Sequence, residues 1–213
     1  MTAPKLPIVS VITPTWQRHD ELFDRCIPAV QAQTYPRTEH VIISDGPDPV
    51  LSERMASNRT WPPELQRHFI WYWELSVHDP APHYGHLARR AGLEHAGGEL
   101  ITYCDDDDAL RPEHCTLLSA TLAARPDCGF ALSRMLSHSP SGTSVIGAGT
   151  PACGNVGTPM IMHRRDVLEH ANWDQAGQFE DWDLVAAWAD AGVLYAQADA
   201  ETSDVWPSAY RGR

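Results

Sequence analysis

Basic residues are scarce in this chain, with 16 Lys and Arg against 28 Asp and Glu and a formal net charge of −12. Affinity for a phosphate backbone comes from clustered Lys and Arg, so we expect no nucleic-acid partner. No apolar run reaches the length of a membrane span, and residues 1–7 lack the apolar stretch of a secretory signal. We therefore expect a cytoplasmic protein without a transmembrane segment.

Paired cysteines are also missing. The five cysteines are an odd number and include no Cys-x-x-Cys pair, which argues against a structural zinc site and against a disulfide framework. Reduced and mostly buried thiols are expected instead. With these classes of protein excluded, the remaining signals are hydrophobic periodicity and the placement of carboxylates.

Apolar, β-branched runs alternate with helical patterns along the sequence, which is typical of a βα-wound, largely parallel sheet. The 213 residues suit one domain, an α/β fold with helices flanking a Rossmann-like central sheet. The strands are predicted at Ile8–Thr13, His40–Ser44, Phe69–Leu75, Leu100–Cys104, Gly129–Ser137 and Met160–His163. The helices are predicted at Asp20–Gln33, Val50–Asn58, His86–His95, Pro112–Ala124, Arg165–His170 and Glu180–Ala191. Residues 139–157 are rich in Ser, Gly and Thr and are expected to form a loop, and Trp71, Trp73 and Trp188 to lie in the core.

Four consecutive aspartates, Asp105 to Asp108, follow the buried strand pattern at Leu100–Cys104. Ligands of α/β sheets bind at the carboxyl ends of the strands, so these side chains are placed where a ligand would lie. Asp105 and Asp107 can point toward one site, and a divalent cation with phosphate oxygens is a partner that would neutralise them. A solvated turn with Asp108 as a helix cap explains one of the four carboxylates only.

Several segments in order resemble inverting family 2 glycosyltransferases, which have the GT-A fold and transfer sugar from a nucleotide diphosphate donor. Residues 9–15 (VSVITPT) are similar to the first strand and its nucleotide-contacting loop in that family, and residues 41–46 (VIISDG) to its second strand. Residues 88–108 resemble the block that ends in the Asp-x-Asp motif, and residues 180–184 (EDWDL) resemble the Glu-Asp motif. The resemblance implies a donor half at about 8–110 and an acceptor half at about 111–213.

The resemblance also implies roles for individual residues. Asp181 would be the general base, Asp107 the ligand of a Mn or Mg ion, and Asp105 the partner of the ribose hydroxyls. Asp45 would accept a hydrogen bond from the base of the nucleotide, a UDP-sugar by default, although an ordinary Asp-Gly turn is the alternative. The donor-binding residues implied in this way are Thr13, Pro14, Thr15, Asp45, Arg89, Asp105 and Asp106.

The chain departs from the family pattern at two positions. Arg90 stands where Asn is frequent, which adds positive charge near the donor, and no histidine follows the Glu-Asp motif, since the last one is His170. The acceptor is expected to be a small molecule, a peptide or a lipid-linked group. The alternatives are a noncatalytic nucleotide-sugar-binding protein, a metal-dependent phosphatase and a nucleotidyltransferase, although the segment at 14–18 lacks the glycines of the last class.

Overall fold

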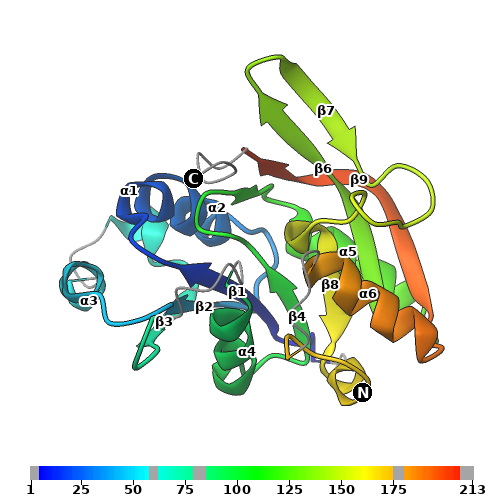
Figure 1. Ribbon diagram of the computed structural model, residues 1–213, viewed down its shortest axis with the longest axis horizontal. Coiled ribbons are helices and arrows are strands. Elements are labelled where there is room, and N and C mark those ends of the chain that lie inside the picture. Colours follow the sequence, from blue (N-terminus) through cyan, green and yellow to red (C-terminus); the bar gives the residue numbers. More distant parts are fainter. Residues whose placement is uncertain (1–4, 58–61, 79–84, 175–179, 207–213) are drawn as a thin grey trace.

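The computed structural model describes residues 5–57, 62–78, 85–174 and 180–206. In these residues one mixed sheet runs through the molecule, with helices against both of its faces (Figure 1). The strands are β1 (Val9–Thr15), β2 (Thr38–Ser44), β3 (Phe69–Glu74), β4 (Leu100–Tyr103), β5 (Ala109–Leu110), β6 (Phe130–Ser139), β7 (Gly142–Ile146), β8 (Ile161–Arg164) and β9 (Tyr195–Val205). The α-helices are α1 (His19–Glu21), α2 (Ile27–Gln31), α3 (Pro49–Ala56), α4 (His86–His95), α5 (His114–Ala124) and α6 (Glu180–Asp190).

The sheet has the strand order β3-β2-β1-β4-β8-β6-β9-β5, with β7 paired to β6. Strands β3, β2, β1 and β4 are parallel to one another, and antiparallel pairing begins where β8 joins β4. Because the chain reverses its strand order at β1, the loops after β1 and β4 open side by side at one edge of the sheet. The predicted α/β sheet with flanking helices is confirmed.

Two apolar clusters fill the faces of the sheet. Helices α2, α3 and α5 pack on one face, where Val11 and Ile42 are fully buried. Helices α4 and α6 pack on the other face, where Ile12 and Trp188 are fully buried. The alternation of Val11 and Ile12 between the clusters is the period of two that a strand imposes, so the strand ends hold the polar side chains in fixed directions.

The helix predicted over Asp20–Gln33 is interrupted. Between α1 and α2, Leu22–Cys26 form a π-helical turn in which the N–H of Ile27 bonds to the carbonyl of Leu22. Pro28 follows directly and has no N–H to give to a helical ladder. Single π-turns of this kind occur mostly inside α-helices and frequently near functional sites, and this one carries Arg25.

The second half of the chain differs from the prediction in two places. The segment expected to be a loop, residues 139–157, contains β7, which forms a hairpin with β6 that projects from the sheet in Figure 1. Strand β9 was not predicted, although it pairs in parallel with β6 and carries β5 at its other side. The short helix predicted at Arg165–His170 is confirmed and is a 3-10 helix at Arg165–Glu169. Of the three tryptophans expected in the core, Trp188 is fully buried, whereas Trp71 is 46% exposed on the edge strand β3.

Candidate functional site

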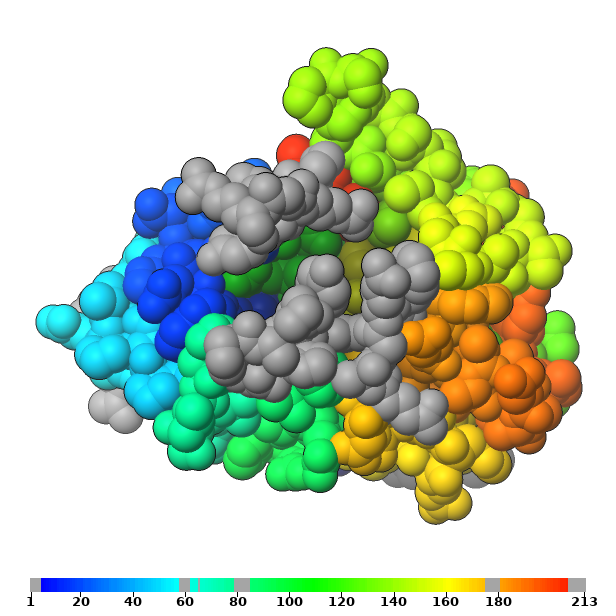
Figure 2. Space-filling model, viewed as in Figure 1, coloured from blue at the N-terminus to red at the C-terminus, as the bar shows by residue number. Residues whose placement is uncertain are grey.

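The four aspartates lie in the turn between β4 and β5, at the carboxyl edge of the parallel strands. Asp106 and Asp108 are buried, and Asp105 and Asp107 are partly exposed. In Figure 2 the surface is hollowed over the green residues that follow β4, between the blue N-terminal segment and the yellow and orange later part of the chain. The prediction that these carboxylates gather at a strand end is therefore matched by their positions.

Arg18, in the loop after β1, bridges two of the aspartates. Its Nη1 lies 3.2 Å from Oδ1 of Asp106 and 2.5 Å from Oδ2 of Asp107. The neighbouring Gln17 has a φ of 55°, a left-handed conformation that is uncommon for a residue with a Cβ. Non-glycine residues in such regions gather at functional sites, where the surrounding contacts hold them. Arg18 was not predicted as a site residue from the sequence. The feature that could have indicated it is a single basic residue in the loop after the first strand.

Arg25 and Trp206 also contact the aspartate turn. Arg25 donates a hydrogen bond to the main-chain carbonyl of Asp107, and its guanidinium lies 4.0 Å from the ring centroid of Trp206. The main-chain N–H of Trp206 donates to Oδ1 of Asp108 at 3.3 Å. These contacts join the π-turn, the aspartate turn and the end of β9, and sequence reasoning identified none of them.

The crowded carboxyl groups are harder to ionise than ordinary aspartates. Burial raises the pKa of Asp106 to about 7, even though Arg18 beside it acts in the opposite direction. Burial also raises the pKa of Asp107, and burial together with Asp105 and Asp107 raises the pKa of Asp108 well above its usual range. A turn of this kind is stabilised by cations, which favour the ionised carboxylates.

Asp105 pairs with Arg89 on α4, and the charge of Arg89 also acts on Asp181. Nη2 of Arg89 lies 2.5 Å from Oδ1 of Asp105, and its guanidinium lies 5.1 Å from the ring centroid of the buried Trp173. Burial raises the pKa of Asp181, whereas the N–H of Trp182 and the charge of Arg89 lower it. The negative charge of Asp105 raises the pKa of Asp181. The structure therefore brings Asp105, Arg89 and Asp181 from three separate elements into one electrostatic cluster.

Asp45 follows β2 at the same edge and has a free acceptor. Its Oδ2 lies 3.1 Å from Nδ1 of His78, and the imidazole of His78 is stacked on Trp16 with ring centroids 4.1 Å apart. Its Oδ1 is buried and has no hydrogen-bond partner among the described residues. A buried carboxylate oxygen without a donor costs free energy, so this atom is suited to a ligand N–H.

Three further residues of the predicted donor site, and the neighbouring Arg90, each lie in a different environment. The side chain of Thr13 is buried, and its hydroxyl pairs with Nε2 of His40 at 2.8 Å. Pro14 is buried beside Gly85, and Thr15 lies near Asp106, whose pKa it lowers. Arg90, expected to add charge near the donor, instead pairs with Asp174 at 2.6 Å on the exposed side of α4.

The aspartate turn supplies carboxylate oxygens, the donors that Mg and Mn prefer. Within the described residues, however, no group of three or more His, Cys, Asp or Glu side chains is arranged to hold a metal ion. Arg18 already neutralises Asp107. The described residues therefore offer a divalent cation one or two carboxylates and not a complete set of ligands.

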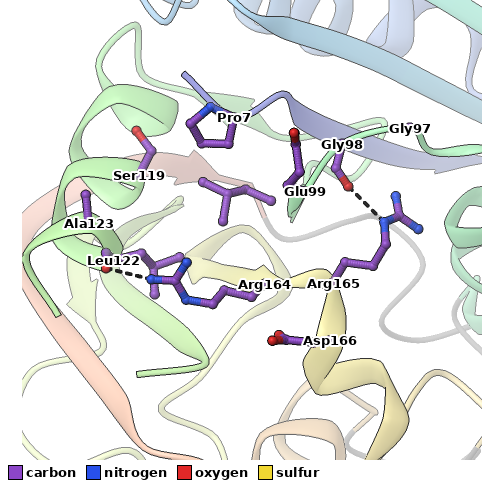
Figure 3. A pocket seen from close by; sticks show the side chains of 11 residues that line it. Pro7, Gly97, Gly98, Glu99, Ser119, Leu122, Ala123, Arg164, Arg165 and Asp166 are labelled. Carbon is purple, nitrogen blue, oxygen red and sulfur yellow. Dashed lines mark hydrogen bonds between the residues drawn. The ribbon is translucent and has the colours of Figure 1, made fainter. Parts of the chain in front are cut away.

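A separate cavity of about 480 Å³ lies at the other end of the strands, near Pro7 and Leu100 (Figure 3). Two arginines line it, but both are occupied by main-chain carbonyls. Arg164 donates to the carbonyl of Leu122, and Arg165 donates to the carbonyls of Gly98 and Ala96. These bonds satisfy carbonyls near the ends of α5 and α4, a structural task, and the cavity holds none of the aspartates described above.

Comparison with known proteins identifies the fold. No family model matches the sequence, and no curated protein matches it. Among solved structures, the chain is similar to S. aureus TarS 1-349 in complex with UDP, with a TM-score of 0.72, 16% identity, and coverage of 94% of this chain and 61% of that one. It is also similar to the mannosyltransferase PcManGT from Pyrobaculum calidifontis in complex with GDP-Man and Mn2+, with a TM-score of 0.68, 16% identity, and coverage of 98% and 59%.

The chain thus spans about 60% of the length of these two solved structures. The likeness shows the GT-A fold, which the sequence resemblance implied. None of the helices in the described part of the chain is long and apolar enough to cross a membrane.

Proposed function

We propose that this chain is a glycosyltransferase that moves a sugar from a nucleotide diphosphate donor to an acceptor hydroxyl or other nucleophile with inversion. The observation that carries the proposal is the cluster of Asp105, Arg89 and Asp181 at the carboxyl edge of a GT-A sheet. Asp105 would contact the donor, and Asp181 would contact the acceptor. This arrangement supplies a donor-positioning group and a base from separate elements, as an inverting transfer requires.

The donor base would lie at Asp45. Its partnerless Oδ1 would accept the ring N–H of a uracil, and the stacked pair of Trp16 and His78 would fix the direction of the carboxylate. Thr15 and Asp106, which lie close to each other, would contact the sugar-phosphate part of the donor, and Asp105 would accept from the ribose hydroxyls. A UDP-sugar is the donor that we favour. One of the solved neighbours holds UDP and another holds GDP-Man with Mn2+.

In the transfer step, the acceptor oxygen attacks the anomeric carbon and its proton passes to the carboxylate of Asp181. The bond between the anomeric carbon and the phosphate oxygen breaks, and the nucleoside diphosphate leaves with the electron pair. A divalent cation bound through Asp107 would stabilise the negative charge that develops on this leaving group. Arg89 holds Asp105 in place and favours the ionised form of Asp181, which is the form that accepts a proton.

Ligand-induced stabilisation tests the donor assignment. UDP, GDP, UDP-GlcNAc and GDP-Man would each be added with and without Mn while thermal unfolding is followed, because a ligand that binds only the folded state raises the melting temperature. We expect a Mn-dependent rise with one nucleotide class. The rise should be lost in Asp45→Ala and kept in Asp20→Ala, an exposed aspartate on α1. No stabilisation by any of the four compounds would overturn the donor site.

A noncatalytic nucleotide-sugar-binding protein would pass the same test, so transfer itself needs a second readout. The donor identified by stabilisation would be incubated with the enzyme, and nucleoside diphosphate release would be measured with candidate small-molecule, peptide and lipid-linked acceptors. Acceptor-dependent release supports the transferase. Binding without release in the presence of every acceptor class would favour the noncatalytic alternative.

A further inference from the structure

Three aromatic side chains form a row along one face of the edge strand β3, the face on which α4 packs. Phe69, Trp71 and Trp73 occupy alternating positions and therefore point to one side of the sheet, while Ile70 and Tyr72 pack on the core beneath the other side. Phe69 is 78% exposed and Trp71 is 46% exposed. This aromatic row lies beside α4, which covers β1 and β2 on the same face of the sheet (Figure 1).

The rings of the aromatic row are nearly aligned. The centroids of Phe69 and Trp71 are 6.4 Å apart with planes inclined by 17°, and those of Trp71 and Trp73 are 6.1 Å apart with planes inclined by 33°. Trp73 is in turn stacked on His95 of α4, with centroids 4.1 Å apart and an angle of 11°. The three rings therefore follow one another closely along the strand, and the row ends against α4.

A carboxylate holds the central ring in place. Nε1 of Trp71 donates to Oε2 of Glu39 at 3.1 Å, while Oε1 of Glu39 accepts from the hydroxyl of Ser10 at 2.7 Å and from the N–H of Gly97 at 2.6 Å. An exposed tryptophan would ordinarily sample several rotamers. Here its ring is oriented before any ligand arrives, which lowers the entropy lost on binding.

We propose that the aromatic row binds a neutral carbohydrate chain at a site distinct from the donor site. A sugar ring has an apolar C–H face and a hydroxyl rim, which complement the ring faces of Phe69 and Trp71 and the carboxylate of Glu39. Successive rings along the strand would contact successive sugars. This inference concerns binding alone and does not rest on the proposed transfer reaction.

Charge and area argue against other occupants. The chain has a net charge of −12, and Glu39 borders the aromatic row, so an anionic lipid surface would be repelled. The exposed parts of Phe69 and Trp71 amount to roughly 250 Å² on the scale of whole aromatic side chains. A standard interface buries about 800 Å² per partner, which this surface alone is too small to supply to a second copy.

Calorimetric titration with cellohexaose, maltohexaose and chitohexaose tests the site. We expect one of these oligosaccharides to bind, and Trp71→Ala to bind it at least tenfold more weakly. Trp71→Phe should keep most of the affinity because it retains a flat ring, which guards against misfolding of the alanine variant. The matched control is Tyr195→Ala, an aromatic residue of similar exposure, 38%, on β9. Its affinity should equal that of the unchanged protein.

Each contrary result is distinct. Absence of binding to all three oligosaccharides, or equal binding by Trp71→Ala, would overturn the carbohydrate site. Dimerisation that Trp71→Ala abolishes in sedimentation experiments would assign the aromatic row to a second copy of the chain. Trp71-dependent association with neutral phosphatidylcholine vesicles would assign it to a lipid surface. Nucleotide binding at Asp45 is read out separately, so either assignment can fail alone.

Discussion

Nη2 of Arg89 lies 2.5 Å from Oδ1 of Asp105, and the same guanidinium lowers the pKa of Asp181. A single buried cation on α4 therefore acts on both carboxylates of the proposed reaction. Because only 4% of the Arg89 side chain is exposed, its charge is poorly screened by water and its influence on both neighbours is strong. The first two predictions follow from this relationship.

Replacing the proposed base should separate catalysis from binding. Asp181→Asn keeps the shape of the side chain but cannot accept the acceptor proton, so the rate of transfer should fall by about 10² to 10⁴-fold. Donor affinity should stay within a factor of about two, measured by calorimetry. Asp183→Asn, two residues along α6, is the matched control and should keep its activity. Undiminished transfer by Asp181→Asn would rule out Asp181 as the base.

The rate of transfer should have an acid limb set by Asp181. The base must be ionised, and burial raises its pKa, so activity should decline as the pH falls through a value above that of an ordinary aspartate. Arg89→Met removes a charge that lowers this pKa, so the limb should move to higher pH. Arg89→Lys, which keeps the charge, should move it less. The profile of kcat/KM against pH checks both, and a limb that stays in place in Arg89→Met would contradict the coupling.

Arg18 should compete with divalent cations for the aspartate turn. Its guanidinium is 2.5 Å from Oδ2 of Asp107, the carboxylate proposed to bind Mn. Arg18→Gln should therefore bind Mn several-fold more tightly without donor at pH 8, which is above the raised pKa of Asp106. Titration followed by electron paramagnetic resonance measures this affinity. Arg54→Gln, which removes a surface pair with Asp20, serves as the control. Unchanged or weaker Mn binding by Arg18→Gln would show that the two cations do not share a site.

Buried neutral histidines should make the fold sensitive to acid. Burial lowers the pKa of His114 to about 3, and its ring nitrogens pair with the hydroxyls of Thr102 and Thr202. Between about pH 3 and 6.5 the unfolded chain binds a proton at this residue that the folded chain does not. The contribution of the neutral histidine to the free energy of unfolding is therefore fully present above pH 6.5 and is lost as the pH falls. At pH 5 the loss is about 2 kcal/mol per histidine.

Urea unfolding of the unchanged protein and of His114→Gln at pH 7.5 and 5.0 tests this expectation. The loss of unfolding free energy between the two pH values should be about 2 kcal/mol smaller in the variant, since glutamine does not titrate. The aspartates with raised pKa act in the opposite direction, but they are present in both proteins and cancel in the comparison. An equal pH dependence in the two proteins would show that His114 takes no part.

The elements predicted from the sequence are those with strong local signals. Strand β4 is a short, fully buried run with the sequence LITY, and α4, which ends at His95, is followed by Gly97 and Gly98, so periodicity and turn residues suffice. Strand β9 has the sequence YAQADAETSDV, with small or acidic side chains that disfavour strands. It forms because β6 offers a partner along its whole length, a tertiary effect that no local window contains.

The candidate site was predictable to the same extent. Asp45, Asp105 and Asp107 each follow a recognisable strand, so their shared edge could be deduced. Arg18 and Trp206 could not be, because their contacts with the aspartate turn join segments 88 and 98 residues apart in the sequence. The exposure of Trp71 was hidden for a related reason. Whether an aromatic strand is central or at an edge depends on the strand order of the whole sheet.

The hydrogen bond from Trp206 to Asp108 has a consequence for how the protein is made. During synthesis the aspartate turn emerges from the ribosome well before β9, which must pair with β6 before Trp206 can reach the turn. A nascent chain therefore holds four crowded carboxylates without one of their partners, at a stage when domains begin to fold. The aspartate turn should therefore reach its final arrangement only after β9 has paired with β6.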